Sequence, residues 1–551
     1  MEIQRMTGLL IHPRSKLLVR RLVLDRALYL IAHLCKVPYG ISRDSTNFLA
    51  SRKLSSLIAL VLWCNDLASR GWAEPIVTPT SSPRAFNVVI VLADDLGYGD
   101  IGCYGARDIP TPHIDLLASE GTRFTDFYVS QPVCTASRAS LLTGCYAQRV
   151  GLEGALNHTS VHGIHNQEYL LSELFHDSGY VTGVFGKWHL GMQPQFLPTR
   201  HGFDEFLGIP YSNDNGPLHP VIRGIPPLPL LAGERVISHD PDQHLWTQWI
   251  TESACQFIER HRDKPFFLYV AHIMPHVPIF CRPAFRGKSQ RGLYGDVVSE
   301  LDWSVGEIRA TLRRVGLTDK TWFIFLSDNG PFLSYGDHAG SAYPLREGKL
   351  TTFEGGVRVP CLMTWPGVIP AAHVCTDMIT AMDLWPTCAR LLHAALPSHP
   401  IDGVDMWDVI TAKPGASNPR RHFFYYSGRE LHAVREGVWK LHVSHDYLTP
   451  LEPRGRDGKP AGYGHLQPLS ITDSGIRGIA SRHGYAVKSL PLSLYNLNED
   501  PGESRNVAEE HPMIVQRLMQ LILGAREELG DSLTGHPGKL RSPGRLEAPH
   551  D

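Results

Sequence analysis

Short apolar runs recur along the chain, and each gives way to charged or amide side chains. "NVVIVLA" and "WFIFL" have no polar residue after their first position, and the other runs are nearly as apolar. Such runs are typical of strands that are buried on both faces of a parallel sheet. The polar residues that follow the four runs are Asp94 and Asp95, Lys187 and His189, His272 and His276, and Asp328 and Asn329.

Amphipathic patterns separate these runs and predict helices over 113–120, 168–178, 243–262 and 294–315. Strands that alternate with helices indicate an open, mostly parallel α/β sheet. Ligands bind beyond the carboxyl ends of the strands in such sheets. We therefore expect the four polar clusters to lie at one edge and to form one site.

The C-terminal part has a different pattern. Residues 422–445 alternate in short β-rich segments, "LSLYNLNED" adds a further strand, and 510–528 has the pattern of an amphipathic helix. This predicts a small α+β subdomain on an antiparallel sheet. We place a catalytic domain at 85–410 and this subdomain at 411–535.

Two C-terminal segments are expected to be irregular. Residues 448–480 are rich in glycine and proline and predict a long excursion. Residues 536–551 have the composition of a disordered tail.

The first 80 residues do not have the pattern of a folded domain. Arg52 and Lys53 precede an apolar run that ends at Cys64, and Ala73 is a small residue at a suitable cleavage position. This order is typical of a secretory signal over about 50–73. We expect translation to start downstream of Met1 and the protein to be exported to the periplasm or the extracellular space.

Two alternatives remain for this segment, a lipid attached to Cys64 and an amphipathic anchor. Bulky Trp63 disfavours the lipid. The apolar run is too short to span a bilayer, and no later run is long enough, so stable membrane insertion is not expected.

Charge and cysteine content limit the classes of partner and scaffold that we expect. The 551 residues have a formal net charge of −2, which gives no electrostatic reason to expect nucleic acid as a partner. The ten cysteines form no C-x-x-C pair and no disulfide framework, so most are expected to be buried apolar residues.

Asp94 and Asp95 form a candidate metal site with Asp328 and Asn329. Adjacent carboxylates repel each other unless a cation neutralises them. Four oxygen ligands without sulfur or imidazole favour Ca²⁺ or Mg²⁺ over zinc. For a single such pair a helix cap or an Asx-turn before Gly97 would be the better explanation; two pairs on separate strands favour a metal.

Basic side chains form a further group of candidate residues. Lys187 and His189 flank Trp188, His276 lies between two prolines, and Lys349 precedes two threonines and a Gly-Gly turn. Each of them alone could be a solvated loop residue. Together they suit an anionic substrate and proton transfer.

Cys134 lies at the predicted start of a helix in "QPVCTASRASLLTG". The simplest interpretation is a small buried residue followed by an N-cap serine. The alternative is a reactive centre, because free N–H groups at a helix start stabilise an anion and Arg138 can reach back towards residue 134. With a metal and several cations, this predicts a site for a tetrahedral oxyanion ester, either sulfate or phosphate.

Motifs in this order identify a resemblance to type I sulfatases, particularly the arylsulfatase A-like branch. "CTASR" is similar to the formylglycine signature C-x-[P/A]-S-R, and it is followed by "LLTG". The other matching segments are "LADDLGYGDIGCYG", "FGKWHLG", "LGIPYSNDNGP", "SDNGP", "GKLTTFEGGVRVP" and "LYNLNEDPGESRNVA". The resemblance covers about 85–530 and implies an alkaline-phosphatase-like sandwich with a smaller C-terminal antiparallel sheet.

The resemblance implies a role for each matching residue. Cys134 would be oxidised to formylglycine, whose hydrate is the nucleophile. Asp94, Asp95, Asp328 and Asn329 would bind Ca²⁺, or alternatively Mg²⁺, together with residue 134. Arg138 and Lys187 would hold the hydrate, His189 would act as its base, Ser212, Lys187, Lys349 and His276 would contact the sulfate, and His276 or Lys349 would protonate the leaving alcohol.

The family mechanism implied for this chain has two stages. One hydroxyl of the hydrate attacks sulfur, which gives a covalent sulfo-enzyme and expels the alcohol. The second hydroxyl then loses its proton to His189, sulfate leaves and the aldehyde returns. The substrate would be an aryl sulfate or a sulfated carbohydrate.

Ala136 departs from the commonest signature, which has proline there. The maturation partner is therefore either a formylglycine-generating enzyme or an anaerobic sulfatase-maturating enzyme. A phosphate or phosphonate monoester hydrolase and a catalytically silent protein that binds sulfated glycans are the alternative functions.

Overall fold

The computed structural model describes residues 86–469, 471–539 and 546–547. The predicted N-terminal extension, signal segment and Cys64 lie outside the described residues. No described helix is both long and apolar enough to cross a bilayer.

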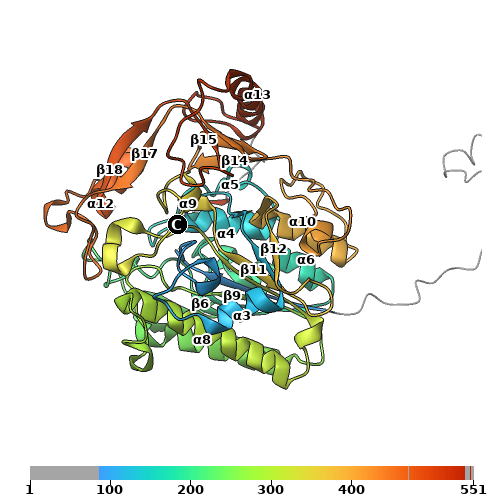
Figure 1. Cartoon of the computed structure of the whole chain (residues 1–551). Helices are drawn as coiled ribbons and strands as arrows, with labels where there is room; N and C mark the ends of the chain where they lie inside the picture. Colours follow the sequence, from blue (N-terminus) through green and yellow to red (C-terminus); the bar gives the residue numbers. More distant parts are fainter. Residues whose placement is uncertain (1–85, 470, 540–545, 548–551) are drawn as a thin grey trace, which may run out of the picture. The chain divides into compact units, whose positions relative to one another are not determined.

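A ten-stranded mixed sheet forms the centre of the described chain (Figure 1). In spatial order its strands are β12 (His373–Cys375), β2 (Thr122–Phe124), β11 (Cys361–Thr364), β10 (Thr321–Ser327), β1 (Asn87–Ala93), β9 (Phe266–Ala271), β5 (Val181–Lys187), β6 (Glu205–Ile209), β7 (Pro229–Ala232) and β8 (Arg235–His239). The five strands from β10 to β6 run parallel, and antiparallel pairs flank them on both sides. The four predicted apolar runs are β1, β5, β9 and β10.

Side chains of β1 alternate between two apolar cores, as successive residues of a strand must. Val89 and Val91 belong to the core beneath α3 (Pro112–Glu120), α7 (Trp246–Arg260) and α8 (Gly292–Arg314). Val88 and Ile90 belong to the other core, beneath α4 (Cys134–Thr143), α6 (Leu171–Asp177) and α10 (Leu384–Leu391). Both faces of the sheet are covered, which explains the absence of polar residues inside the strand.

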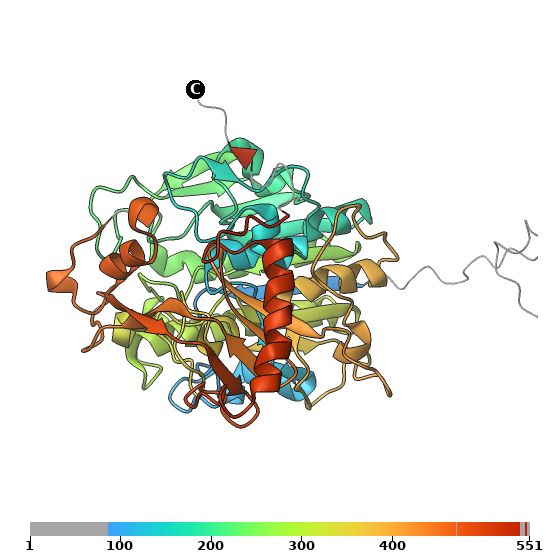
Figure 2. The same cartoon turned by 90° about the horizontal axis from the view of Figure 1, so that it is seen from above.

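The C-terminal part forms a smaller antiparallel sheet with the order β14-β15-β16-β19. Its strands are β14 (His422–Ser427), β15 (Glu430–Glu436), β16 (Trp439–His442) and β19 (Ser493–Asn496). Helix α13 (Pro512–Leu529) packs on β15 and β16 and lies across the sheet in Figure 2. The predicted fold class, a large mixed sheet with a small antiparallel C-terminal sheet, is confirmed.

The two segments expected to be irregular contain regular elements. The hairpin of β17 (His445–Pro450) and β18 (Tyr485–Leu490) overlaps residues 448–480, and α12 (Ile471–His483) precedes β18. In the tail, β20 (Leu546–Glu547) pairs with β4 (His162–Gly163). These pairings depend on partners far away in sequence, which composition does not reveal.

The remaining short elements are β3 (Phe127–Tyr128), which pairs with β13 (Ile379–Thr380), and three helices of one turn each, α5 (Ala147–Val150), α9 (Glu354–Val357) and α11 (Trp407–Ile410). Most of the eight cysteines within the described residues are buried, as expected.

Candidate active site

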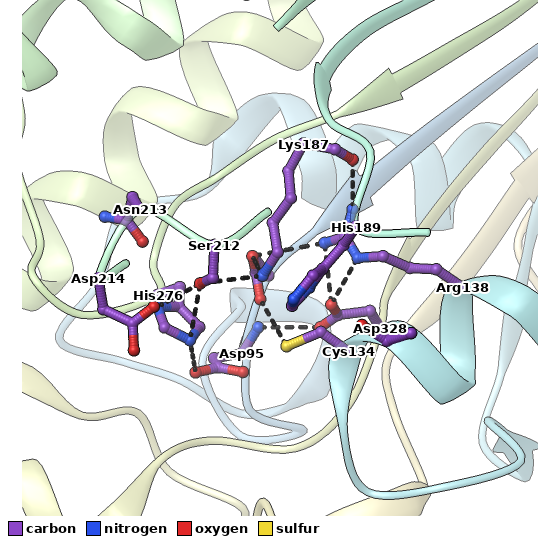
Figure 3. A network of polar contacts seen from close by, with 12 residues as sticks. Asp95, Cys134, Arg138, Lys187, His189, Ser212, Asn213, Asp214, His276 and Asp328 are labelled. Carbon is purple, nitrogen blue, oxygen red and sulfur yellow. Dashed lines mark hydrogen bonds and ion pairs between the residues drawn. The ribbon is translucent and has the colours of Figure 1, made fainter. Parts of the chain in front are cut away.

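The predicted polar clusters meet at the carboxyl ends of the parallel strands (Figure 3). Asp94 and Asp95 follow β1, Asp328 and Asn329 follow β10, and Lys187 is the last residue of β5. His276 follows β9 and joins them, whereas His272 lies apart, with its Nε2 atom 3.0 Å from Ser304 Oγ. Residues far apart in sequence thus form one buried polar cluster.

Cys134 is the first residue of α4, and its side chain faces the cluster. Its Sγ atom lies 3.5 Å from Asp94 Oδ1 and 3.3 Å from Lys349 Nζ. The N-cap residue Val133 makes no capping bond through its side chain, so the N-cap serine of the simplest interpretation is not found. Burial raises the pKa of the Cys134 thiol well above its usual value, so an unmodified thiolate nucleophile is disfavoured here.

Arg138 is fully buried one turn further along α4. Its Nε and Nη2 atoms donate to Asp328 Oδ2 at 3.1 and 2.9 Å, and Nη1 donates to the Lys187 carbonyl at 2.9 Å. Its Nη2 atom also lies 3.4 Å from Asp94 Oδ2. The predicted approach to Cys134 is therefore indirect, since Asp94 lies between the guanidinium and the sulfur.

Two buried lysines face the paired carboxylates. Lys187 Nζ lies 2.5 Å from Asp94 Oδ2, and Lys349 Nζ lies 2.7 Å from Asp95 Oδ1. Burial disfavours the charged form of the lysines and of the carboxylates, but the attraction between the opposite charges is stronger. The pKa of Lys349 is therefore held well above its usual value, and the pKa of Asp94 well below its usual value. Both lysines therefore remain cationic, since the pKa of Lys187 is raised as well.

The oxygen cluster fits a hard cation. Asn329 donates through Nδ2 to Asp95 Oδ1 at 2.7 Å, which leaves its buried Oδ1 atom without a hydrogen-bond partner. Asp94, Asp95, Cys134 and His276 each offer a ligand atom, all within 4.8 Å of one another. Burial and then the charge of Asp94 raise the pKa of Asp328 to about 6. A bound cation would engage the unpartnered oxygen and relieve this repulsion.

His189 is held in one tautomer by the backbone. Its Nε2 atom lies 2.7 Å from the Leu156 carbonyl, which only accepts, so Nε2 carries the proton. The buried Nδ1 atom has no partner and presents a lone pair. Burial, and next the charge of Lys187, place the pKa of His189 well below its usual range, so the ring is a neutral base.

Ser212 links the lysine to the second histidine. Its hydroxyl lies 3.3 Å from Lys187 Nζ and 3.4 Å from His276 Nε2. His276 donates through Nδ1 to the Val277 carbonyl at 2.6 Å, and its Nε2 atom lies 3.7 Å from Asp95 Oδ2. Apart from His272, the residues that the sequence analysis assigned to the site therefore lie in this cluster or against it.

Backbone strain accumulates around the site. Asp95, His189 and Leu350 all have positive φ angles, of 64°, 65° and 73°, in the left-handed region that residues with a side chain rarely adopt. Such conformations persist where the surrounding structure fixes them, and they cluster at functional sites. The side chains are thus held by the fold rather than by local preference.

A cavity of about 380 Å³ opens over Cys134, His189, His276 and Lys349. Its outer wall includes Asp214, Phe332 and Ile479. Asp214 lies within the matching segment "LGIPYSNDNGP", Phe332 directly follows "SDNGP", and Ile479 lies in the excursion predicted over 448–480. Sequence reasoning missed the rest of the wall, Arg429, Glu430 and His483, which belong to the C-terminal part and carry no recognisable motif.

Two family models match the chain: Sulfatase over residues 86–394, and the C-terminal region of aryl-sulfatase over residues 418–544. Arylsulfatase A of Bos taurus is 38% identical over 82% of this chain and 90% of its own length. N-acetylgalactosamine-6-sulfatase of Canis lupus familiaris is 39% identical over 79% of this chain and 85% of its own length. The crystal structure of Ps i-CgsB in complex with k-i-k-neocarrahexaose is 26% identical, with a TM-score of 0.65, and covers 83% of this chain and 94% of that one.

Proposed function

Since this chain belongs to the sulfatase family, we propose that it releases sulfate from sulfate monoesters through a formylglycine residue made from Cys134. One observation supports this most: a buried cysteine at the first turn of α4 contacts Lys349 and Asp94, and Asp94 in turn binds Lys187. Formation of the aldehyde removes H₂S from the side chain and adds one oxygen, with the oxidant supplied by the maturation enzyme. The hydrate would offer two hydroxyl groups, whereas serine or cysteine offers one nucleophile only.

The cation site is proposed to hold Ca²⁺, with Mg²⁺ as the alternative. Asp94, Asp95, Asp328 and the Asn329 amide oxygen would be its ligands, together with the modified residue 134. When bound, the cation would stabilise negative charge on the sulfate oxygens. The unpartnered Asn329 oxygen supports this ligand set.

The chain's own cations would orient the ester. Lys187 and Lys349 lie on two sides of Cys134 and remain charged, and Ser212 and His276 would complete the contacts to the sulfate. Arg138, which donates to Asp328, would position the carboxylates and the hydrate relative to each other. Fixed positive groups stabilise developing charge without reorganisation at the moment of reaction.

Proton transfer is proposed for the two histidines. His189 would accept a proton at Nδ1, which lies free in the buried site because Nε2 is committed to Leu156. His276 or Lys349 would donate a proton to the leaving alcohol. The substrate is proposed to be a sulfated carbohydrate or an aryl sulfate, since the named relatives include both an arylsulfatase and an N-acetylgalactosamine sulfatase.

Export, cleavage near Ala73, and maturation by a formylglycine-generating or anaerobic enzyme remain part of the proposal. They rest on the segment over 50–73 and on the "CTASR" signature.

The test is sulfate release from 4-nitrophenyl sulfate by protein produced together with a maturation enzyme. We expect turnover that is lost in Cys134→Ala and reduced by chelation, with recovery on addition of Ca²⁺. A much faster reaction with 4-nitrophenyl phosphate would favour a phosphate esterase instead. Absence of any turnover from matured protein would support the silent glycan-binding alternative.

A further inference from the structure

A second cavity, of about 480 Å³, lies beside the catalytic cavity. Three chain segments line both: 214–219, 276–280 and 332–338 each begin in the catalytic cavity and reach the second one within six residues. The two cavities therefore share a wall. A ligand seated over Cys134 would have to extend along these segments to reach the second cavity.

Three cations line the second cavity, Arg223, Arg286 and Lys459. Arg223 donates to the His219 carbonyl, and Lys459 lies over the Tyr463 ring. Within the described ranges none of the three forms an ion pair with a carboxylate. Nearby arginines on the same segment differ in this respect, since Arg282 and Arg291, before and after Arg286, are both paired with carboxylates.

The neighbouring imidazoles favour an anion as well. His219 Nδ1 accepts the backbone N–H groups of Val221 and Ile222, so its proton lies on Nε2 and can be donated. His244 donates to Asp242 through Nδ1 and accepts from Arg286 through Nε2 at 3.2 Å, which fixes the guanidinium. Asp457 is the one carboxylate among the described residues that line the cavity, so the lining keeps a net positive charge.

We propose that this cavity binds a second acidic group, a sulfate or a carboxylate, on an oligosaccharide whose reacting sulfate lies over Cys134. Arginine recognises such groups through paired N–H donors, and Arg286 keeps most of its donors free. The inference rests on the proposed function and assigns a substrate class: glycans with at least two acidic groups.

The experiment compares a disulfated disaccharide of neutral sugars, without a uronic acid, with its monosulfated counterpart as competitors of 4-nitrophenyl sulfate hydrolysis. We expect the inhibition constant of the disulfated compound to be the lower one in the native sequence. In Arg223→Ala/Arg286→Ala it should rise about tenfold relative to the KM for 4-nitrophenyl sulfate, and the two disaccharides should become equivalent.

Arg235→Ala/Lys288→Ala is the matched control, since it removes the same charge from exposed residues outside both cavities. The inference is overturned if the disaccharides compete equally with the native sequence, or if both double variants weaken the disulfated compound alike. Calorimetric binding to Cys134→Ala protein needs no turnover. If this protein binds the two disaccharides equally, the proposed role of the second cavity is contradicted. If it prefers the disulfated one but the native sequence hydrolyses no sulfate ester, only the proposed function is contradicted.

Discussion

At the scale of single residues, hydrogen bonding decides what each group in the site can do. The Leu156 carbonyl fixes the proton of His189 on Nε2 and leaves Nδ1 as an unpartnered lone pair in a buried setting. Burial then keeps the ring neutral. A histidine on a solvated loop would titrate near its usual pKa of about 6.5.

The pH dependence of kcat follows from this setting. His189 must be unprotonated to act as a base, and its pKa is lowered, so the base form persists into acid. We expect the acidic limb of the kcat profile to fall below the ordinary histidine range, with activity retained at about pH 5.5. Steady-state rates with saturating 4-nitrophenyl sulfate measure it. An acidic limb at or above about pH 6.5 would contradict the assignment of His189.

At the scale of secondary-structure elements, helix α3 takes a capping group from another helix. Helix α3 begins at Pro112, and its N-cap residue Thr111 makes no capping bond through its side chain. Asp302 of α8 supplies the acceptor instead and receives the Ile114 N–H at 2.7 Å. Burial raises the pKa of Asp302 to about 7, although the backbone hydrogen bonds lower it.

Asp302→Asn should therefore change how stability depends on pH. The raised pKa means that the native protein holds this proton more tightly than the unfolded chain does. The native sequence therefore loses stability as the pH rises from about 4 to about 7. Asparagine keeps an acceptor and does not titrate. We expect the variant to gain about 2–4 kcal/mol relative to the native sequence between pH 4 and pH 8.

Urea unfolding at about pH 4 and about pH 8 measures this difference in the free energy of unfolding. The contributions of other titrating groups are the same in both proteins and cancel in the comparison. Asp302→Ala is the control, since it removes the cap at both pH values and should cost about 1 kcal/mol. Parallel pH curves for Asp302→Asn and the native sequence would show that Asp302 does not titrate as stated.

At the scale of the whole molecule, the C-terminal sheet holds the loop that carries Lys349. Lys440 of β16 is fully buried and donates to the Thr352 carbonyl, 2.8 Å away, and to Glu354 and Glu503 at 3.0 and 2.8 Å. The Glu503 carboxylate also accepts the Glu354 backbone N–H. The apolar core continues across the same boundary, since Phe423 and Tyr425 pack against Tyr128.

Lys440→Met tests this connection. The variant removes the cation that Glu354 and Glu503 share. Glu354 keeps Arg358 at 3.5 Å, whereas among the described residues Glu503 keeps only His442 as an ion-pair partner. Breaking a buried group of this kind costs about 3–5 kcal/mol. Lys488→Met, on an exposed strand position, is the control and should cost little. Denaturant unfolding measures both, and adding Glu503→Gln to Lys440→Met should recover part of the loss. A cost within about 1 kcal/mol for Lys440→Met would contradict the role of the cluster.

The shared core also predicts one cooperative unfolding transition for the residues matched by the two family models. Scanning calorimetry should show a single peak whose calorimetric and van't Hoff enthalpies agree. Two separated peaks would mean that the C-terminal sheet folds independently of the large sheet.

Features that depend on local sequence patterns were predicted from the sequence, and features that depend on contacts between distant segments were not. Polar residues after β1, β5 and β10 were found because parallel strands end at one edge of a sheet, whatever the details of packing. The preference of Arg138 for Asp328, the tautomer of His189 and the cavity wall from Arg429 and Glu430 were not found. They depend on contacts between distant segments, which no local pattern records. The calcium ligands and the modification of Cys134 stay predictions.

The central claim is that residue 134 reacts as an aldehyde rather than as a thiol. Mass spectrometry of the peptide containing residue 134, from protein that hydrolyses 4-nitrophenyl sulfate, tests it most directly. We expect the mass of a side chain that has lost H₂S and gained one oxygen, and a product with an aldehyde-specific hydrazine. A fully active preparation in which residue 134 has the mass of cysteine throughout would contradict the account.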